Sequence, residues 1–291
     1  EFGYDFVEFD KIINSLIEVN NQEVICMSEN EVLSLLSKMN TEIKNETIIN
    51  ILKDITYTQR ENFLELPKAY ENWESWPWRF NRRYSFNRRP ILKINDDLIW
   101  GNRQLYLSLN YLVDLIFNGK LKCNSKEMEQ FKGKVTFQKG KEFNEFVFKK
   151  INDITSFTLY SNVKKVNNKK IANDNNEDLG DIDILAIDDV NKILYAIEVK
   201  RFKFSKNPYE IKKEYEKMFD DSNNVSFSTK HMKRVQWLKK HIKDVKQEYN
   251  LTDEKWKVKG MFIVNEPLIS KDIYNKDIKC VSIPELTKDS F

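Results

Sequence analysis

The sequence predicts an α/β fold in two domains. The first, over residues 1–130, is mostly helical, and the second, over residues 131–291, has helices that flank a mixed sheet. The length of 291 residues exceeds one typical domain of about 100–200 residues. A polar stretch at residues 122–134 separates two patterns: helical periodicity precedes it, and short apolar runs of strand type between charged helices follow it.

The N-terminal domain is expected to contain helices and one hairpin. Ser28 and Glu31 have the spacing of a capping box, which marks the start of a helix. Asn118 and Gly119 are a helix-stop signal. The pattern predicts helices around residues 31–36, 47–52 and 105–117, and a hairpin of residues 91–94 with 98–100.

The C-terminal domain is predicted to alternate helices and strands. Amphipathic or charged helices are expected at residues 142–154, 210–219 and 229–249. Apolar runs of strand type lie at residues 157–166, 182–187, 193–199, 258–264 and 278–283. This order of elements predicts a mixed sheet with helices packed on it.

Composition excludes several classes of protein. The three cysteines are far apart and form no CxxC pair, which argues against a disulfide framework or a zinc site. Two histidines leave little room for a histidine-based triad. No run has the roughly 18–20 apolar residues of a membrane span, and no signal-peptide pattern is present. We therefore expect a cytoplasmic protein with no membrane partner.

Two predicted strands carry the residues that point to chemistry. Side chains alternate faces along a strand, so Glu198 and Lys200 share a face, and a hairpin brings Asp183 beside Glu198. Crowded carboxylates repel unless a cation lies between them. Mg²⁺, or Mn²⁺ in its place, suits such oxygen ligands. A lysine there can position a metal-bound water and offset phosphate charge.

The Glu-x-Lys tripeptide has little weight by itself. It recurs at Glu42 and at Glu210, both in charged segments with helical character. Only the Glu198 copy ends a run of apolar strand residues and follows the pattern Gly-Asp-Ile-Asp at hairpin distance. The alternative is a solvated hairpin that happens to carry acids and a lysine.

Residues 180–200 resemble the PD-(D/E)xK nuclease superfamily, which includes restriction endonucleases and Mrr-like enzymes. The resemblance covers roughly residues 140–264 and implies a restriction-endonuclease-like domain. It implies Asp183 and Glu198 as metal ligands, the Val199 carbonyl as a further ligand, and Lys200 as the catalytic lysine. The name-giving proline is absent. Asp181 shares a face with Asp183, but we favour Asp183 because the apolar run follows it directly.

A preceding helix in many superfamily members supplies a glutamate to the metal site. At the matching position this chain has Asn144. Glu145 is our candidate for that role, and Glu142 remains open.

Basic residues near the candidate site could hold a nucleic-acid backbone. Arg201 and Lys203 follow the second strand, and Lys233 and Arg234 lie on a later helix. A solvated helix face is the alternative for the helical pair. Residues 73–89 mix aromatic side chains with arginines, a composition that can stack bases or form a core.

The expected function is a metal-dependent nuclease that hydrolyses phosphodiester bonds, with DNA as the expected substrate, in a bacterial defence or restriction system. Two alternatives stay open: a degenerate nuclease-fold module that binds nucleic acid or a protein partner, and an RNA-cleaving nuclease. The sequence does not separate endonuclease from exonuclease. It is compatible with a homodimer or a larger assembly.

Overall fold

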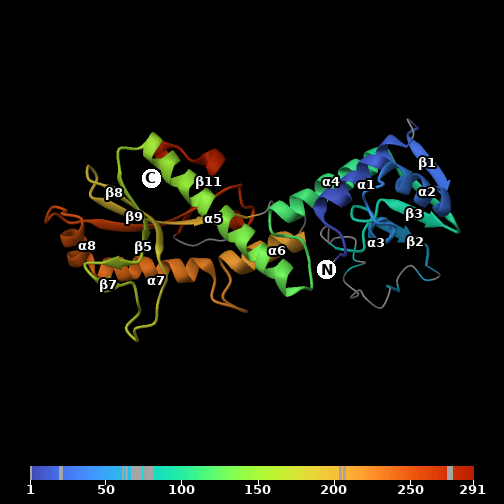
Figure 1. The fold of residues 1–291 in the computed structure, drawn as a ribbon. Coiled ribbons are helices and arrows are strands. Elements are labelled where there is room, and N and C mark those ends of the chain that lie inside the picture. The colour runs from blue at the N-terminus through green and yellow to red at the C-terminus, as the bar shows by residue number, and fades with distance from the viewer. Residues whose placement is uncertain are drawn as a thin grey trace. The chain divides into compact units, whose positions relative to one another are not determined.

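The computed structural model describes residues 2–19, 22–60, 62, 65–66, 74, 76, 82–202, 205, 208–273 and 278–291. The chain divides into two compact units, Glu1–Phe137 and Gln138–Phe291. The division falls within one continuous helix, α5 (Lys126–Ile154; Figure 1). The polar stretch at residues 122–134 is thus helical from Lys126 onward, because its lysine, glutamate and glutamine residues are good helix formers.

Helices predominate in the N-terminal unit, as predicted. The expected helices are α2 (Glu29–Met39), α3 (Asn45–Ile55) and α4 (Asn102–Phe117), and the structure adds α1 (Phe6–Glu18), which was not predicted. The expected capping box is present at the start of α2, where the Ser28 hydroxyl accepts from the backbone N–H of Glu31. Helix α4 ends at the predicted Asn118-Gly119 signal, and Gly119 has a positive φ of 61°.

The N-terminal unit also contains a four-stranded sheet with the order β1-β4-β3-β2. The predicted hairpin is confirmed as antiparallel β3 (Ile91–Ile94) and β4 (Asp97–Gly101). Strands β1 (Val24–Ser28) and β2 (Thr56–Thr58) were not predicted. Both are short, so their strand state depends on pairing with β4 and β3 rather than on a local pattern.

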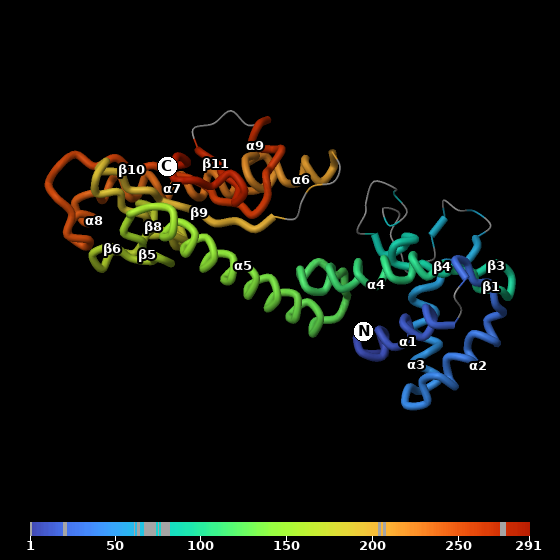
Figure 2. Tube along the Cα trace, turned by 90° about the horizontal axis from the view of Figure 1, so that it is seen from above, coloured from blue at the N-terminus to red at the C-terminus, as the bar shows by residue number. Residues whose placement is uncertain are grey.

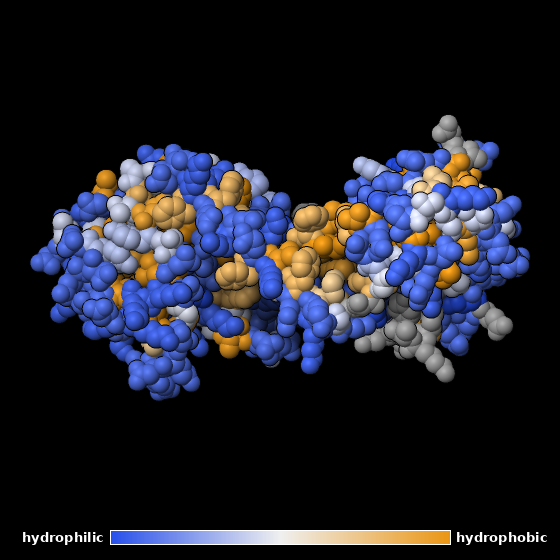
Figure 3. Space-filling view, viewed as in Figure 1, coloured by the Kyte–Doolittle hydropathy of each residue, from blue (hydrophilic) through white to orange (hydrophobic). Residues whose placement is uncertain are grey.

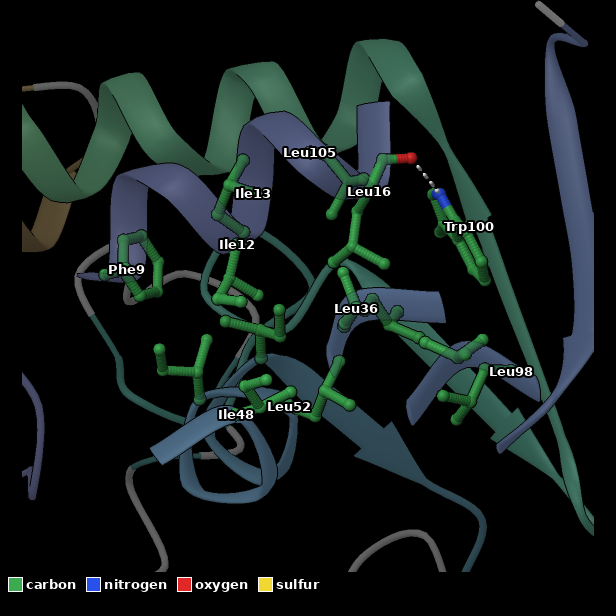
Figure 4. Close-up of a cluster of buried hydrophobic side chains, with 14 of the residues drawn as sticks. Phe9, Ile12, Ile13, Leu16, Leu36, Ile48, Leu52, Leu98, Trp100 and Leu105 are labelled. Carbon is green, nitrogen blue, oxygen red and sulfur yellow. Dashed lines mark hydrogen bonds between the residues drawn. The ribbon is translucent and has the colours of Figure 1, made fainter. Parts of the chain in front are cut away.

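The core of the N-terminal unit lies between α1, α2, α3, α4 and the sheet (Figure 4). Ile12 and Leu16 of α1 are fully buried there, together with Leu105 of α4. The indole Nε1 of Trp100 donates a hydrogen bond to the backbone oxygen of Leu16 at 3.3 Å. This hydrogen bond ties β4 to the end of α1 within the apolar cluster.

The C-terminal unit is built on a five-stranded sheet with the order β11-β10-β9-β8-β5. Its strands are β5 (Thr158–Val163), β8 (Ile182–Asp188), β9 (Ile193–Lys200), β10 (Lys257–Val264) and β11 (Lys279–Ser282). Strand β8 runs antiparallel to β5 and β9, whereas β10 runs parallel to β9 and β11. The predicted mixed α/β class is confirmed.

Two predicted segments of this unit are divided in the structure. The strand expected at residues 157–166 becomes β5 and the short β6 (Lys165–Val166), which pairs with β7 (Lys169–Lys170). The helix expected at residues 229–249 becomes α7 (Phe227–Lys240) and α8 (Ile242–Glu248). The break is at His241, whose Nδ1 lies 3.0 Å from the backbone oxygen of Trp237.

The sheet lies between α5 on one face and α7 on the other (Figure 2). Val147 and Ile151 of α5 pack against Ile197 of β9. On the opposite face, Val235 and Leu238 of α7 belong to the same cluster as Leu194 and Ala196. The alternation along β9 thus assigns even-numbered residues, including Glu198 and Lys200, to the α7 face.

The unit also contains α6 (Pro208–Met218) and α9 (Ser270–Ile273), and two short 3-10 helices, Ile283–Glu285 and Lys288–Ser290, near its end. Hydrophilic residues cover most of the face of the C-terminal unit that Figure 3 shows. Among the residues that the structure describes, none of the helices combines the length and apolar character needed to cross a membrane.

Candidate functional site

The hairpin of β8 and β9 brings the two predicted carboxylates together. Ile184 is paired with Ile197, so Asp183 and Glu198 are the next residues of the antiparallel register. The Oδ2 atom of Asp183 accepts a hydrogen bond of 2.7 Å from the backbone N–H of Val199. This bond holds the Asp183 carboxylate against the end of β9.

Lys200 completes the predicted set on the same face. Its Nζ lies 2.7 Å from Oε1 of Glu198, and its side chain is 28% exposed. The ammonium also lies 5.3 Å from the centre of the Phe227 ring, at the start of α7. Lys200 is therefore fixed beside Glu198 yet remains accessible to solvent and to a ligand.

Helix α7 contributes two further residues beneath the carboxylates. The guanidinium of Arg234 forms an ion pair with Glu198 and donates to the backbone oxygen of Asp181 at 2.6 Å. His231, one helical turn earlier, places Nε2 3.0 Å from the Ala196 oxygen and Nδ1 3.7 Å from Oε2 of Glu198. Both are buried, so α7 forms the polar floor of the site.

The close contact between helix α7 and the sheet depends on a glycine in β10. A Cβ atom at Gly260 would lie 2.8 Å from Cγ2 of Val235 and 3.4 Å from Nε2 of His231. These distances leave no room for a larger residue unless α7 shifts. Gly260 therefore sets how closely His231 and Arg234 lie beneath Glu198.

The electrostatics of the two carboxylates differ. Burial and the negative charge of Glu198 raise the pKa of Asp183 to about 6. Burial alone would raise the pKa of Glu198 too, but the charges of Lys200 and Arg234 outweigh it and lower that pKa. Burial lowers the pKa of His231 to about 4, which keeps its ring neutral near pH 7. The site thus contains one carboxylate whose charge is stabilised by its neighbours, Glu198, and one whose charge is disfavoured by burial and by the adjacent carboxylate, Asp183.

The donors at the site fit a hard divalent cation. Asp183 and Glu198 supply carboxylate oxygens, and Val199 between Glu198 and Lys200 supplies a backbone carbonyl. No group of three or more His, Cys, Asp and Glu side chains arranged to hold a metal occurs within the described parts of the chain. Mg²⁺ commonly binds through one or two carboxylates and keeps several waters, so two carboxylates and a carbonyl suit it.

Glu145 is not joined to this cluster. It lies on α5 with a side chain that is 68% exposed, 3.8 Å from the ammonium of Lys141. Glu142 is exposed as well and lies 3.3 Å from Lys139; the hydrogen bonds of Gln138 and Lys139 lower its pKa most, and Arg201 contributes least. Asn144 differs from both, because its Oδ1 is buried without a hydrogen-bond partner. The position that matches the family glutamate is thus an inward-facing amide.

The four predicted nucleic-acid contacts have different surroundings. Arg201, which directly follows β9, and Lys233 on α7 are exposed. Arg234 is 7% exposed and paired with Glu198, so it is placed to hold that carboxylate rather than to reach a backbone phosphate. Lys203 lies outside the described residues, as does much of the aromatic and arginine-rich segment at residues 73–89.

Sequence reasoning did not identify His231 as part of the site. The sequence does contain a pattern that could have indicated it. Ser228, His231 and Arg234 are spaced by three residues along a helix and lie on its buried side. A polar stripe at helical spacing beside apolar residues indicates polar groups that face a partner inside the protein. That partner, Glu198, lies 33 residues earlier than His231 and on another element.

Comparison with known proteins addresses the biological setting. The sequence pattern of a family described as anti-phage protein Upx-like matches residues 1–259. The chain belongs to the Upx-like family. The match covers the N-terminal unit and, in the C-terminal unit, β8, β9 and α7, which form the site. Membership confirms the expected defence role. None of the curated proteins and none of the solved structures matched the chain.

Proposed function

We propose that this member of the Upx-like family is a metal-dependent nuclease that hydrolyses phosphodiester bonds, with DNA as the substrate. The observation that carries the proposal is the meeting of Asp183, Glu198 and Lys200 at the end of the β8–β9 hairpin. Phosphodiester hydrolysis needs a positioned water and positive charge near the phosphate. Phage DNA is a substrate that fits the defence role of the family.

Asp183, Glu198 and the Val199 carbonyl would hold the cation in this proposal. A bound Mg²⁺ or Mn²⁺ supplies an activated water and offsets the charge that develops on the phosphate and the leaving oxygen. Asp183 is the residue best suited to receive it, because burial and the negative charge of Glu198 raise its pKa, and a bound cation would offset both effects. Val199 contributes through its N–H as well, which fixes the orientation of the Asp183 carboxylate.

Lys200 would orient the attacking water and donate to a phosphate oxygen. Its ammonium is held by Glu198 at 2.7 Å, so its position is defined before substrate arrives. Arg234 and His231 act through Glu198 as positioning residues, because neither is exposed to substrate. The exposed Arg201 and Lys233 are the described residues suited to bind backbone phosphates.

The decisive experiment incubates the protein with supercoiled plasmid DNA, linear DNA and single-stranded RNA, with Mg²⁺ or with a chelator. We expect Mg²⁺-dependent cleavage of DNA, and a loss of about 100-fold or more in Lys200→Ala, the usual range for a general acid or base. Lys212→Ala is the matched control, because it alters the exposed Glu210-Ile-Lys212 copy of the tripeptide. Cleavage that survives in Lys200→Ala refutes the site assignment.

One observation favours a second candidate, a nuclease-fold module that binds without cutting. Both oxygens of Glu198 already have cationic partners, Lys200 on one side and Arg234 on the other. If these bridges are permanent, the carboxylate has a structural role. This candidate predicts nucleic-acid binding that does not depend on Mg²⁺ and is unchanged in Glu198→Gln. Cleavage of RNA alone in the assay above would instead indicate a ribonuclease.

A further inference from the structure

The N-terminal unit contains a cavity that the proposed nuclease chemistry does not use. Its volume is about 400 Å³, within the range of small-molecule sites. Apolar and aromatic side chains form most of its wall, including Phe6, Phe9, Leu112, Ile116 and Phe131. Three arginines, Arg83, Arg88 and Arg89, also line it. An apolar cavity with a few polar groups at one point is the usual form of a ligand site.

Protein groups already hold two of these arginines. The Nε atom of Arg83 lies 3.1 Å from Oε1 of the buried Glu74. One nitrogen of Arg89 donates to the backbone oxygens of Lys53 and Thr56 at 2.7 and 2.9 Å, near the end of α3. Their positive charges and donors therefore serve the fold of this unit.

Arg88 lines the same cavity, and one of its guanidinium nitrogens is left unsatisfied. Its Nη1 atom is buried and has no hydrogen-bond partner. The nearby carboxylate of Asp54 accepts a hydrogen bond of 2.8 Å from the hydroxyl of Tyr4. A buried guanidinium nitrogen without an acceptor carries a desolvation cost that a bound anion would remove. Burial accordingly lowers the pKa of Arg88.

We propose that this cavity binds a small organic anion, with its carboxylate or phosphate on Arg88 and its aromatic or aliphatic body against Phe9, Leu112 and Phe131. A guanidinium matches the planar geometry of such oxygen acceptors. The mostly apolar wall disfavours a ligand with several charges, because charges placed against it would be buried without partners.

Isothermal titration calorimetry with 1-naphthyl phosphate, 1-naphthol and inorganic phosphate tests this, in a chelator so that no metal-bound site takes up phosphate. We expect 1-naphthyl phosphate to bind at least about tenfold more tightly than 1-naphthol, which lacks the phosphate, or inorganic phosphate, which lacks the ring. This corresponds to about 1.4 kcal/mol in the free energy of binding. Arg88→Met should abolish this preference while retaining the affinity for 1-naphthol. Arg103→Met, an exposed arginine at the start of α4 outside the cavity wall, should bind as the wild type does.

A second variant keeps the proposal testable if Arg88→Met does not fold. Leu112→Trp fills the cavity from α4 and leaves Arg88 intact. We expect it to abolish binding of both aromatic probes, with circular dichroism unchanged. Failure of the wild type to bind 1-naphthyl phosphate at millimolar concentration overturns the proposal. Equal binding by Leu112→Trp or by Arg88→Met also overturns it.

Discussion

The carboxyl group of Asp183 is buried beside a second carboxylate, and this pairing defines the site at the scale of single residues. The two carboxylates have different partners. Lys200 and Arg234 both form ion pairs with Glu198, whereas Asp183 accepts a hydrogen bond from the Val199 N–H. In the absence of metal, the ionised form of Asp183 therefore destabilises the fold. Replacement of Asp183 by a neutral residue should therefore increase the free energy of unfolding.

Asp183→Asn should stabilise the metal-free protein above pH 6 and have little effect near pH 4. The folded pKa of about 6 exceeds the ordinary value of 3.8, so the folded state binds more protons between these values. Stability therefore falls as the pH rises through this window. One pKa unit corresponds to about 1.4 kcal/mol, so the gain should be on the order of 2–3 kcal/mol at neutral pH.

Urea unfolding in a chelator at the two pH values measures this gain. An equal effect of Asp183→Asn at both values would contradict the linkage to ionisation. Addition of Mg²⁺ should reverse the order of stability, because a cation that binds only the folded state stabilises it. The wild type should respond to Mg²⁺ and Asp183→Asn should respond weakly.

Arg234→Met should destabilise the protein by about 3–5 kcal/mol, the usual cost of leaving one member of a buried ion pair without its partner. Glu198 would retain Lys200 but lose the ion pair on its buried side. Lys233→Met is the matched control, because Lys233 is exposed on the same helix. If the two substitutions cost the same in urea unfolding, Arg234 does not hold Glu198.

At the scale of elements, the packing of α7 on β10 sets the geometry of the site floor. Helix α7 begins at an N-cap, Ser226, whose hydroxyl accepts from the Thr229 N–H. Its buried side faces β9 and β10, and Gly260 supplies the space for that contact. The distance between helix and sheet thus determines how His231 and Arg234 meet Glu198.

Gly260→Ala should destabilise the C-terminal unit by about 1–3 kcal/mol, the cost of an overpacked contact. The added methyl group would lie 2.8 Å from Val235 and force α7 outward. Gly140→Ala is the control, because nothing lies within 4 Å of its added Cβ on α5. Alanine is the better helix former, so that variant should gain up to about 1 kcal/mol. A stabilised Gly260→Ala would refute the tight contact.

At the scale of the whole molecule, each unit has its own hydrophobic core. One buried cluster joins α1, α2, α3, α4 and the N-terminal sheet, and the other clusters surround the five-stranded sheet. Units with separate cores can unfold separately. The match to the Upx-like pattern begins in the first unit and extends into β10 of the second.

Differential scanning calorimetry should accordingly resolve two unfolding transitions. Ile12→Ala, in the N-terminal core, should lower one transition, and Leu185→Ala, in β8, should lower the other. Each substitution removes a fully buried side chain and should cost about 2–5 kcal/mol. Mg²⁺ should raise only the transition that Leu185→Ala lowers. A single transition that both variants shift together would show that the units unfold as one.

The sequence by itself predicted many of the local elements and the juxtaposition of Asp183, Glu198 and Lys200. Alternation along β8 and β9 was enough to predict that Glu198 and Lys200 share a face and that Asp183 lies opposite Glu198. The capping box at Ser28 and the helix stop at Gly119 could also be predicted from the sequence. In each case the residues that matter lie close together along the chain or within one hairpin.

Only the tertiary structure decided which groups surround Glu198. Arg234 and His231 come from a helix whose register against the sheet depends on Gly260 and on the packing of Val235. The short strands β1 and β2, and the cavity beside Arg88, likewise result from contacts between distant segments. Periodicity reports which face of an element is apolar, but burial against a particular neighbour determines which polar groups meet on that face.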